Sequence, residues 1–568
     1  MNLVENAKNQ IDELINKAFT KARLSGSLPE GAPLSGGTVE IPRDTSHGDY
    51  AATHAMAAAK ELKLAPRKIA EAVTGQIELD GSCVKSVSIA GPGFINFVLS
   101  EKWYGDVLQA VEIANSDYGA IDVGKGKRVM VEFVSANPTG QMTIGNARGG
   151  VVGDTLASVL EKAGYDVWRE FLVNDAGNQV DLFGKSIDAR YMQLCVGKDN
   201  YEFPEGGYPG DDIIDLAKMI YDKEGDKLQT LPEKERIEKF IAFGLPYNIA
   251  VMKEHLERYR IHFDEWFYES SMHKNGYIED TLDKLVKGNL TYEKDGALWL
   301  KNTLLGAEKD EVLRRSNGFC TYYTIDIAYH RNKLERGFDK AIDIWGADHH
   351  GHVIRLRTTL SSPELGKSLG IDGEKLELVV MQMMRLLRDG EMVKVGKRTG
   401  KAITLNDLLD EISVDACRFF FNARPDSHLD FDMGLAVRQD SENPVYYVQY
   451  AHARLFSLIS TLAEEGFSVP AYFEIDSALL NSETEFQLIK QISLLPEEIK
   501  YSASNYDPSR IVRYVIELAA CFHRYYSACR IKGEKSDLLL ARLKLADTTR
   551  IVIKNCLDIL GVKAPEKM

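Results

Sequence analysis

The sequence predicts an α/β protein built on an open parallel sheet, with a smaller α/β module before it and an all-α bundle after it. Three observations support this prediction. An apolar β-type run at residues 129–134 is followed by a polar turn and then by a helical pattern. A second strand and helix follow at residues 165–195, as crossover connections in a parallel sheet require. Helical stripes alone recur at residues 487–500, 508–531 and 536–560.

Length and composition favour a globular protein of several domains. The chain has 568 residues, of which 44% are hydrophobic and 27% are charged. The first twenty residues lack the layout of a signal peptide, and no later run has the length of a membrane span. Seven scattered cysteines without a CxxC pair are typical of free thiols in a reducing compartment. We therefore expect a cytoplasmic protein with no membrane association.

The net charge of −15 argues against a protein that coats nucleic acid, because phosphate neutralisation needs Lys and Arg. The charge is uneven, however. From residue 500 onward the chain carries 13 Lys and Arg against 7 Asp and Glu. The C-terminal end is thus the best place for contact with a polyanion, although a merely solvated surface would explain the same imbalance.

Residues 1–118 have the pattern of a separate α/β module. Helical stripes at 3–18, 51–62 and 67–73 are followed by strand patterns at 86–90 and 94–99. These features by themselves predict a packing module without chemistry of its own.

The first candidate binding element is the stretch of residues 128–154, which reads strand, polar turn, helix. In a parallel sheet such a turn can offer backbone N–H groups and a helix N-terminus to a polyphosphate. Its glycines, Gly140, Gly145, Gly149 and Gly150, let a ligand approach the backbone. The spacing matches neither a P-loop nor GxGxxG, and such a turn alone often only reverses the chain.

Two further polar clusters follow. A short strand at 342–345 leads into a loop containing His349, His350 and His352. Three histidines raise the question of a zinc site, but neighbouring positions point apart and no CxxC or HExxH accompanies them, so we assign no metal. The second cluster is a basic loop at 393–401, between a strand-like run at 376–387 and a helix that Thr404 and Asp407 would open as a capping box. Such a loop is usually solvated surface.

These stretches resemble the signatures of one family, and they follow its order. ANPTGQMTIGN at 136–146 resembles the HIGH region of class I aminoacyl-tRNA synthetases, in the form found in arginyl-tRNA synthetases, with Thr143 and Asn146 in place of its two histidines. VKVGKRTG at 393–400 resembles the KMSKRTG loop, with Val395 and Gly396 replacing Met and Ser. FDEWFYES at 263–270, WGADHHG at 345–351 and DACR at 415–418 resemble further motifs of the same family.

The resemblance implies a fold and a division into domains. It implies a Rossmann-like parallel-sheet catalytic domain at 119–430, with a mainly helical insertion around 200–296. HGDYA at 47–51 and IAGPGFINF at 89–97 resemble the N-terminal added domain, which would occupy 1–118 and contact the tRNA corner. Residues 431–568 would form the all-α anticodon-binding domain of the DALR type.

The resemblance also implies roles for individual residues. The catalytic ones are Thr143, Gly145, Asn146, Lys394 and Lys397. The ATP-binding ones are Ala136, Asn137, Pro138, Thr139, Gly140, Gln141, Met142, Ile144, Gly346, Asp348 and His349. The arginine-binding ones are Glu132, Asn137, Glu269, Tyr322, Asp326 and His349. The tRNA-binding ones are Tyr525, Tyr526 and Arg530.

Chemistry supports acids in the implied arginine pocket. A guanidinium is a planar fork of donors that a carboxylate matches in two places, whereas a lysine ammonium does not. Asp326 is the first candidate and Glu269 the second, although the sequence alone favours Glu269 as a surface acid beside a buried Trp266. Without the family, Tyr525 and Tyr526 would be core and rim of the bundle.

The implied activity joins arginine to tRNA(Arg) through an arginyl-adenylate, with ATP as a substrate that brings Mg²⁺. Activation in this family requires bound tRNA, and we expect a monomer. Two alternatives stay open at this point. One is a tRNA-free enzyme that forms adenylates for another acceptor, which should lack the N-terminal module and the bundle. The other is a catalytically weak or silent tRNA-binding paralogue, suggested by the missing HIGH histidines.

Overall fold

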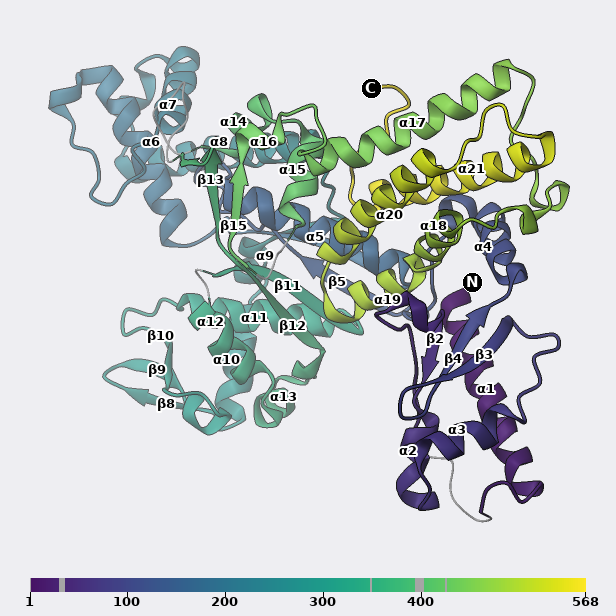
Figure 1. The fold of residues 1–568 in the computed structure, drawn as a ribbon. Coiled ribbons are helices and arrows are strands. Elements are labelled where there is room, and N and C mark those ends of the chain that lie inside the picture. The colour runs from purple at the N-terminus through teal and green to yellow at the C-terminus, as the bar shows by residue number, and fades with distance from the viewer. Residues whose placement is uncertain (1, 30–35, 348–349, 394–402, 424–426) are drawn as a thin grey trace.

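The computed structural model describes residues 2–29, 36–347, 350–393, 403–423 and 427–568. Within these ranges the chain forms an N-terminal α/β module, a central parallel sheet with its helices, and a C-terminal helical bundle that lies beside the N-terminal module (Figure 1). The predicted α/β class, with a parallel sheet and a C-terminal all-α part, is confirmed. None of the helices in the described ranges is both long and apolar enough to span a membrane.

The N-terminal module is an antiparallel sheet covered by helices. Its strands run in the order β1-β2-β4-β3. Their bounds are β1 (Val39–Glu40), β2 (Tyr50–Ala52), β3 (Val84–Ala90) and β4 (Phe94–Leu99), and the helices are α1 (Leu3–Leu24), α2 (His54–Leu62), α3 (Pro66–Thr74) and α4 (Glu101–Ala114). Buried side chains of α1 repeat at the spacing of one helical face, as the sequence predicted.

The central sheet has five parallel strands in the order β12-β11-β5-β6-β7. They are β5 (Arg128–Glu132), β6 (Asp166–Val173), β7 (Glu265–Tyr268), β11 (Lys340–Gly346) and β12 (Leu376–Met381). Helices α5 (Ile144–Lys162), α6 (Asn178–Val196) and α11 (Tyr322–Glu335) connect or cover them. From β5 the chain moves to β6 on one side and later returns to β11 on the other. The β5/β11 pair is therefore the topological switch point, where open α/β sheets bind ligands.

The stretch at 200–296, expected to be a mainly helical insertion, contains four α-helices and also a strand of the central sheet. Helices α7 (Asp211–Glu224) and α8 (Glu233–Arg258) pack on α6 around a small core of their own. Residues 265–268, however, are β7, the edge strand of the parallel sheet. Trp266 stacks on Phe171 of β6, with ring centroids 4.2 Å apart, so tertiary pairing decides the conformation of this aromatic run.

The segment after β7 covers one end of the sheet. It comprises α9 (Glu269–Lys274), α10 (Tyr277–Lys287) and an antiparallel sheet of β8 (Thr291–Lys294), β9 (Ala297–Leu300) and β10 (Glu311–Arg314). After β11 come α12 (His350–Leu360) and α13 (Pro363–Leu369). The single strand expected at 376–387 is instead two. Strand β13 (Met384–Arg388) leaves the parallel sheet after β12 and pairs with β14 (Glu391–Met392) and β15 (Leu429–Asp432).

The C-terminal part is helical from α17 onward. Before it come α14 (Leu405–Glu411), α15 (Val414–Phe421) and α16 (Met433–Ala436). The bundle itself consists of α17 (Pro444–Glu464), α18 (Glu483–Ser493), α19 (Leu495–Asn505), α20 (Ser509–Ala528) and α21 (Ser536–Ile559). The bundle contacts the N-terminal module through the Tyr104 and Phe486 rings, 4.4 Å apart, and through the Lys500 ammonium, 2.9 Å from Glu5.

Candidate active site

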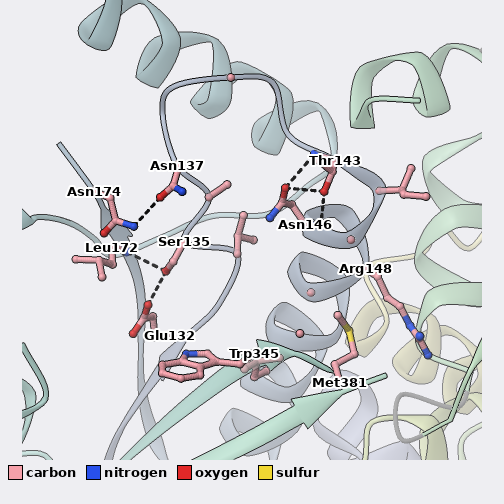
Figure 2. A pocket seen from close by; sticks show the side chains of 18 of the residues that line it. Glu132, Ser135, Asn137, Thr143, Asn146, Arg148, Leu172, Asn174, Trp345 and Met381 are labelled. Carbon is pink, nitrogen blue, oxygen red and sulfur yellow. Dashed lines mark hydrogen bonds between the residues drawn. The ribbon is translucent and has the colours of Figure 1, made fainter. Parts of the chain in front are cut away.

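A cavity of about 660 Å³ opens at the carboxyl ends of β5 and β11, the switch point of the sheet. Most of the residues expected to bind ATP line it, and Figure 2 shows Asn137 among them beside Glu132 of the expected arginine pocket. Tyr322 and Asp326 of the same expected pocket line it as well. The predicted residues of the turn, of α5 and of β11 that line it are Ala136, Asn137, Thr139, Gly140, Gln141, Thr143, Ile144, Gly145, Asn146 and Gly346. These predicted residues thus meet at one place. Asp348, His349, Lys394 and Lys397 lie outside the described residues.

The turn after β5 has a strained backbone. Val134 and Ser135 have φ values of 69° and 36°, in the left-handed region that a β-branched residue rarely adopts. Neighbouring contacts hold this conformation. The Ser135 hydroxyl donates to Glu132 Oε1 at 2.6 Å and accepts from the Leu172 N–H at 3.1 Å (Figure 2). The turn is thereby fixed to the end of β6.

Two residues expected to bind ATP support the turn from behind. Pro138 and Met142 are buried and do not line the cavity. The Pro138 carbonyl accepts from Asn248 Nδ2 of α8 at 2.8 Å, and the Met142 carbonyl accepts from the Leu405 N–H at 2.9 Å. Both carbonyls and both side chains therefore serve the packing of the turn, and contact of these two residues with ATP stays a prediction.

The two residues in place of the HIGH histidines bond to each other. Thr143 is the N-cap of α5, and Asn146 Oδ1 accepts from both the Thr143 N–H and its hydroxyl at 2.9 Å (Figure 2). Asn146 N–H donates back to Thr143 Oγ1 at 3.4 Å. This capping box orients the first turn of α5, whose N-terminus faces the cavity and favours negative charge.

A second capped helix begins beside the first. Thr404 and Asp407 form the capping box that the sequence predicted at the start of α14. Thr143 and Thr404 form an isolated β-bridge, so the N-termini of α5 and α14 lie together. The chain segment containing Lys394 and Lys397 leads directly into α14 in the sequence.

The acidic pocket is built by α11 and α9. The Asp326 side chain is buried, at 4% exposed, and its Oδ2 lies 2.6 Å from His352 Nε2. Glu269, at 5% exposed, opens α9. The alternative of a surface acid is therefore wrong for Glu269. Tyr322 begins α11 with its ring half-exposed, and the negative charge of Asp326, together with burial, raises the pKa of its hydroxyl.

Negative charge dominates this pocket. Burial raises the pKa of Glu269 to about 7, and the charges of Asp326 and Asp175 add to the rise. Asp175 is engaged by the N-terminus of α9, since its oxygens accept from the Ser270 N–H at 2.8 Å and the Ser270 hydroxyl at 2.7 Å. The pocket is therefore suited to a ligand with a delocalised positive charge.

A role for His352 in the pocket was not predicted from the sequence, which indicated His349 instead. In the described structure His352 is paired with Asp326 and stacks on Trp345, with ring centroids 5.6 Å apart and planes 11° apart. The sequence did contain a signal for the position of His352. A helix opening at His350 places His352 within its first turn, near the end of β11.

A buried ionic cluster below the pocket was also missed. Glu132 is paired with Lys333 of α11, and Lys333 Nζ also contacts Asp343 Oδ1 at 2.8 Å. Arg148 of α5 was missed as well. Its guanidinium donates to the carbonyls of Gln382 at 2.7 Å and Met383 at 3.2 Å, and so ties α5 to the break between β12 and β13. Charged residues inside apolar runs, such as Asp343 between two isoleucines, were the available signal.

The three residues expected to bind tRNA lie in different environments. Tyr525 is fully buried in the bundle core, where its hydroxyl donates to the Arg542 carbonyl at 3.3 Å, so a stacking role for it is wrong. It continues the buried stripe of α20. Tyr526 is half-buried under the guanidinium of Arg454, 3.9 Å from its ring centroid. Arg530 is exposed.

The strand order, the switch-point cavity and the two capped helices beside it define a class I aminoacyl-tRNA synthetase fold. Family models agree. The model "tRNA synthetases class I (R), catalytic domain" matches residues 108–203 and 248–432, "Arginyl tRNA synthetase N terminal domain" matches 6–99, and "DALR anticodon binding domain" matches 448–568. The chain belongs to the arginyl-tRNA synthetase family.

Relatives of this protein are similar to it along the whole chain. The chain is 50% identical to the arginine–tRNA ligase of Acetivibrio thermocellus and 49% identical to that of Caldanaerobacter subterraneus, and each alignment covers 100% of both chains. The solved arginyl-tRNA synthetase of Thermus thermophilus has the same fold, with a TM-score of 0.72 at 20% identity over 97% of this chain and 99% of that one.

Proposed function

We propose that this protein is an arginine–tRNA ligase, which converts L-arginine and ATP to arginyl-adenylate and pyrophosphate and transfers arginine to the 3′-terminal adenosine of tRNA(Arg). The acidic pocket of Asp326 and Glu269 beside the N-terminus of α5 is the observation that carries this proposal. Asp326 lines the same cavity as the N-terminus of α5, and its charge acts on the buried Glu269, which supports a guanidinium site next to a phosphate site.

Arginine selection would follow from the two buried carboxylates. A guanidinium would satisfy Asp326 and Glu269 with directed hydrogen bonds, whereas lysine would leave acceptors unpaired. Because a buried polar site penalises a ligand that leaves it unpaired, selection needs no editing step. Tyr322 would cover the guanidinium, and Glu132 and Asn137 would receive the α-amino end. His349, outside the described residues, keeps its proposed role in the same pocket.

The chemical step needs positioning and charge more than covalent help. The arginine carboxylate is the nucleophile, and it attacks the α-phosphate as pyrophosphate leaves. ATP would lie along residues 136–146 with its phosphates at the N-terminus of α5, and would bring Mg²⁺ bound to its own phosphate oxygens. From the sequence, we propose that Lys394 and Lys397 stabilise the negative charge that develops on the phosphates. Asp348 is proposed from the sequence to contact the nucleotide.

Contacts with tRNA are proposed for both ends of the chain. On the bundle, the Tyr446 and Tyr450 rings stack 6.2 Å apart, and Tyr526 lies under Arg454. Half-exposed aromatic rings with a guanidinium suit the unstacked bases of an anticodon loop. Arg530 would contribute charge, and the N-terminal module would contact the tRNA corner. A monomeric state, the cytoplasmic location and the domain limits at residues 118 and 430 remain proposals.

Arginine-dependent exchange of pyrophosphate into ATP tests the proposal. We expect exchange with arginine and tRNA(Arg) together, and none with lysine. Exchange without tRNA would contradict the expected tRNA dependence. Binding of tRNA without exchange in any mixture would favour the silent paralogue. The tRNA-free alternative is already disfavoured, because both the N-terminal module and the bundle are present.

The pKa of Glu269 predicts a pH dependence of arginine use. Because a guanidinium favours the ionised carboxylate, binding should strengthen as pH rises through about 7, where Glu269 loses its proton in the free protein. We expect the arginine KM to fall about tenfold from pH 6 to pH 8. The Glu269→Gln variant should have a higher KM that no longer changes over this range. A pH dependence that survives in Glu269→Gln would assign it to another group.

A further inference from the structure

Three charged side chains are buried together beneath the arginine pocket, and two of them, Lys333 and Asp343, have no assigned role. Glu132 on β5 and Asp343 on β11 are register partners in the parallel sheet. Lys333 of α11 extends between them, with Nζ contacting Glu132 Oε2 and lying 2.8 Å from Asp343 Oδ1. Lys333 and Asp343 are completely buried, and Glu132 is nearly so.

Such a cluster costs stability unless each charge is matched. Burial raises the pKa of Glu132, Lys333 opposes the rise, and the charge of Asp343 adds to it. Without Lys333, two buried carboxylates would face each other, and one would take up a proton. An apolar residue would pack here at lower cost, so the ionic cluster points to a requirement for charge at this position.

The cluster also fixes the direction of the Glu132 carboxylate. Lys333 holds Oε2, and the Ser135 hydroxyl donates to Oε1 at 2.6 Å (Figure 2). Glu132 lines the wall of the cavity, whereas Lys333 and Asp343 lie behind it. Ser135 belongs to the strained turn. The turn, strand β5 and helix α11 together therefore fix the position of the Glu132 carboxylate.

Helix α11 links this carboxylate to the other end of the pocket. Asp326 precedes Lys333 by seven residues, about 10 Å along the helix. His330, between them, has Nδ1 2.7 Å from the Asp326 carbonyl oxygen and Nε2 2.7 Å from Asp343 Oδ2. The rigid helix thereby sets the spacing of the two carboxylates that would receive the two ends of arginine.

We propose that Lys333 is a positioning residue for the amino-acid substrate, which holds Glu132 as a carboxylate aimed into the cavity to receive the α-ammonium of arginine. The proposal rests on the proposed function. Lys333 itself does not contact the substrate and has no effect on ATP binding. It affects arginine binding through Glu132 alone.

The Lys333→Met variant of the full chain tests this role. We expect the arginine KM in pyrophosphate exchange to rise about 10- to 100-fold, as for the loss of a charge-assisted contact, while the KM for ATP and the Kd for tRNA(Arg) stay unchanged. Lys340→Met is the matched control, since Lys340 lies on β11 but its ammonium contacts Tyr506, away from the cavity. An unchanged arginine KM, or equal rises for arginine and ATP, would overturn the proposal.

A double variant separates positioning from folding. In Lys333→Met with Asp343→Asn the unmatched carboxylate charge is removed, so the thermal stability lost in the single variant should be regained. The arginine KM should stay high, because Glu132 still lacks its partner. Recovery of the normal KM would overturn the positioning role. If the unaltered protein shows no arginine-dependent exchange, the proposed function itself fails, which is a distinct result.

Discussion

Replacing Asp326 by asparagine should reduce kcat/KM for arginine by about a thousandfold, since it removes the charge from a buried acceptor of the guanidinium. The shape of the side chain is kept, and His352 Nε2, now 2.6 Å from Oδ2, still has an oxygen to contact. Pyrophosphate exchange measured against arginine concentration gives the effect directly. Binding of tRNA(Arg) should stay within about twofold of the unaltered protein, because Asp326 lies far from the bundle.

Asp283→Asn is the matched control for this experiment. Asp283 is an exposed acid on α10, outside the cavity lining, and its replacement should leave both arginine use and tRNA binding unchanged. If Asp326→Asn also weakens tRNA binding, the residue is structural. If it leaves kcat/KM for arginine within a few-fold, the acidic pocket is not where the guanidinium binds.

Replacing Arg418 by methionine should destabilise the junction between the catalytic part and the bundle by about 3–5 kcal/mol, the usual cost of removing one partner from a buried ion pair. Arg418 on α15 is fully buried and pairs with Asp154 of α5. Its Nε donates to the Leu560 carbonyl at 2.8 Å, and its guanidinium also reaches the carbonyls of Tyr259 and Arg260 at 3.2 and 3.1 Å.

The effect of Arg418→Met should appear as a lower midpoint of the first unfolding transition in urea. A chain of several domains need not unfold in one step, so the first transition is the one to compare. Arg385→Met is the control. Arg385 forms an exposed ion pair with Asp430, 2.8 Å apart, and its loss should cost less than about 1 kcal/mol. Equal midpoints for the two variants would show that Arg418 does not hold the junction.

Much of the site follows from local signals in the sequence. The strand, turn and helix at 128–154 and the capping box at Thr404 depend on residues within a few positions of each other, and both are present. Resemblance then identified Asp326 and Glu269 as the acids of the pocket. A signal of their burial was also present, since Asp326 lies between two isoleucines and Glu269 directly follows three aromatic residues.

Two predictions failed although their signals were in the sequence. Tyr525 follows Ile511, Val515, Leu518 and Phe522 at helical spacing, so its place in the stripe already indicated burial. The aromatic run at 265–268 favoured a strand by its residue types, but helical patterns lie on both sides of it and its partner in the structure is the distant strand β6. For Tyr525 the type of residue was given more weight than its position in the stripe, and for 265–268 the helical surroundings were given more weight than the residue types.

The sequence by itself determined the class of fold, the order of the elements, the position of the phosphate-facing turn and, through resemblance, the acids of the pocket. The tertiary structure alone decided which polar groups meet. It pairs His352 with Asp326, Lys333 with Glu132 and Asp343, and Thr143 with the start of α14. The physical reason is the distance along the chain between the residues that interact. Hydrophobic periodicity and capping are set by neighbours along the chain, whereas a buried ion pair depends on strand order and helix packing, which bring together residues such as Glu132 and Lys333, 201 positions apart, and Asp154 and Arg418, 264 positions apart.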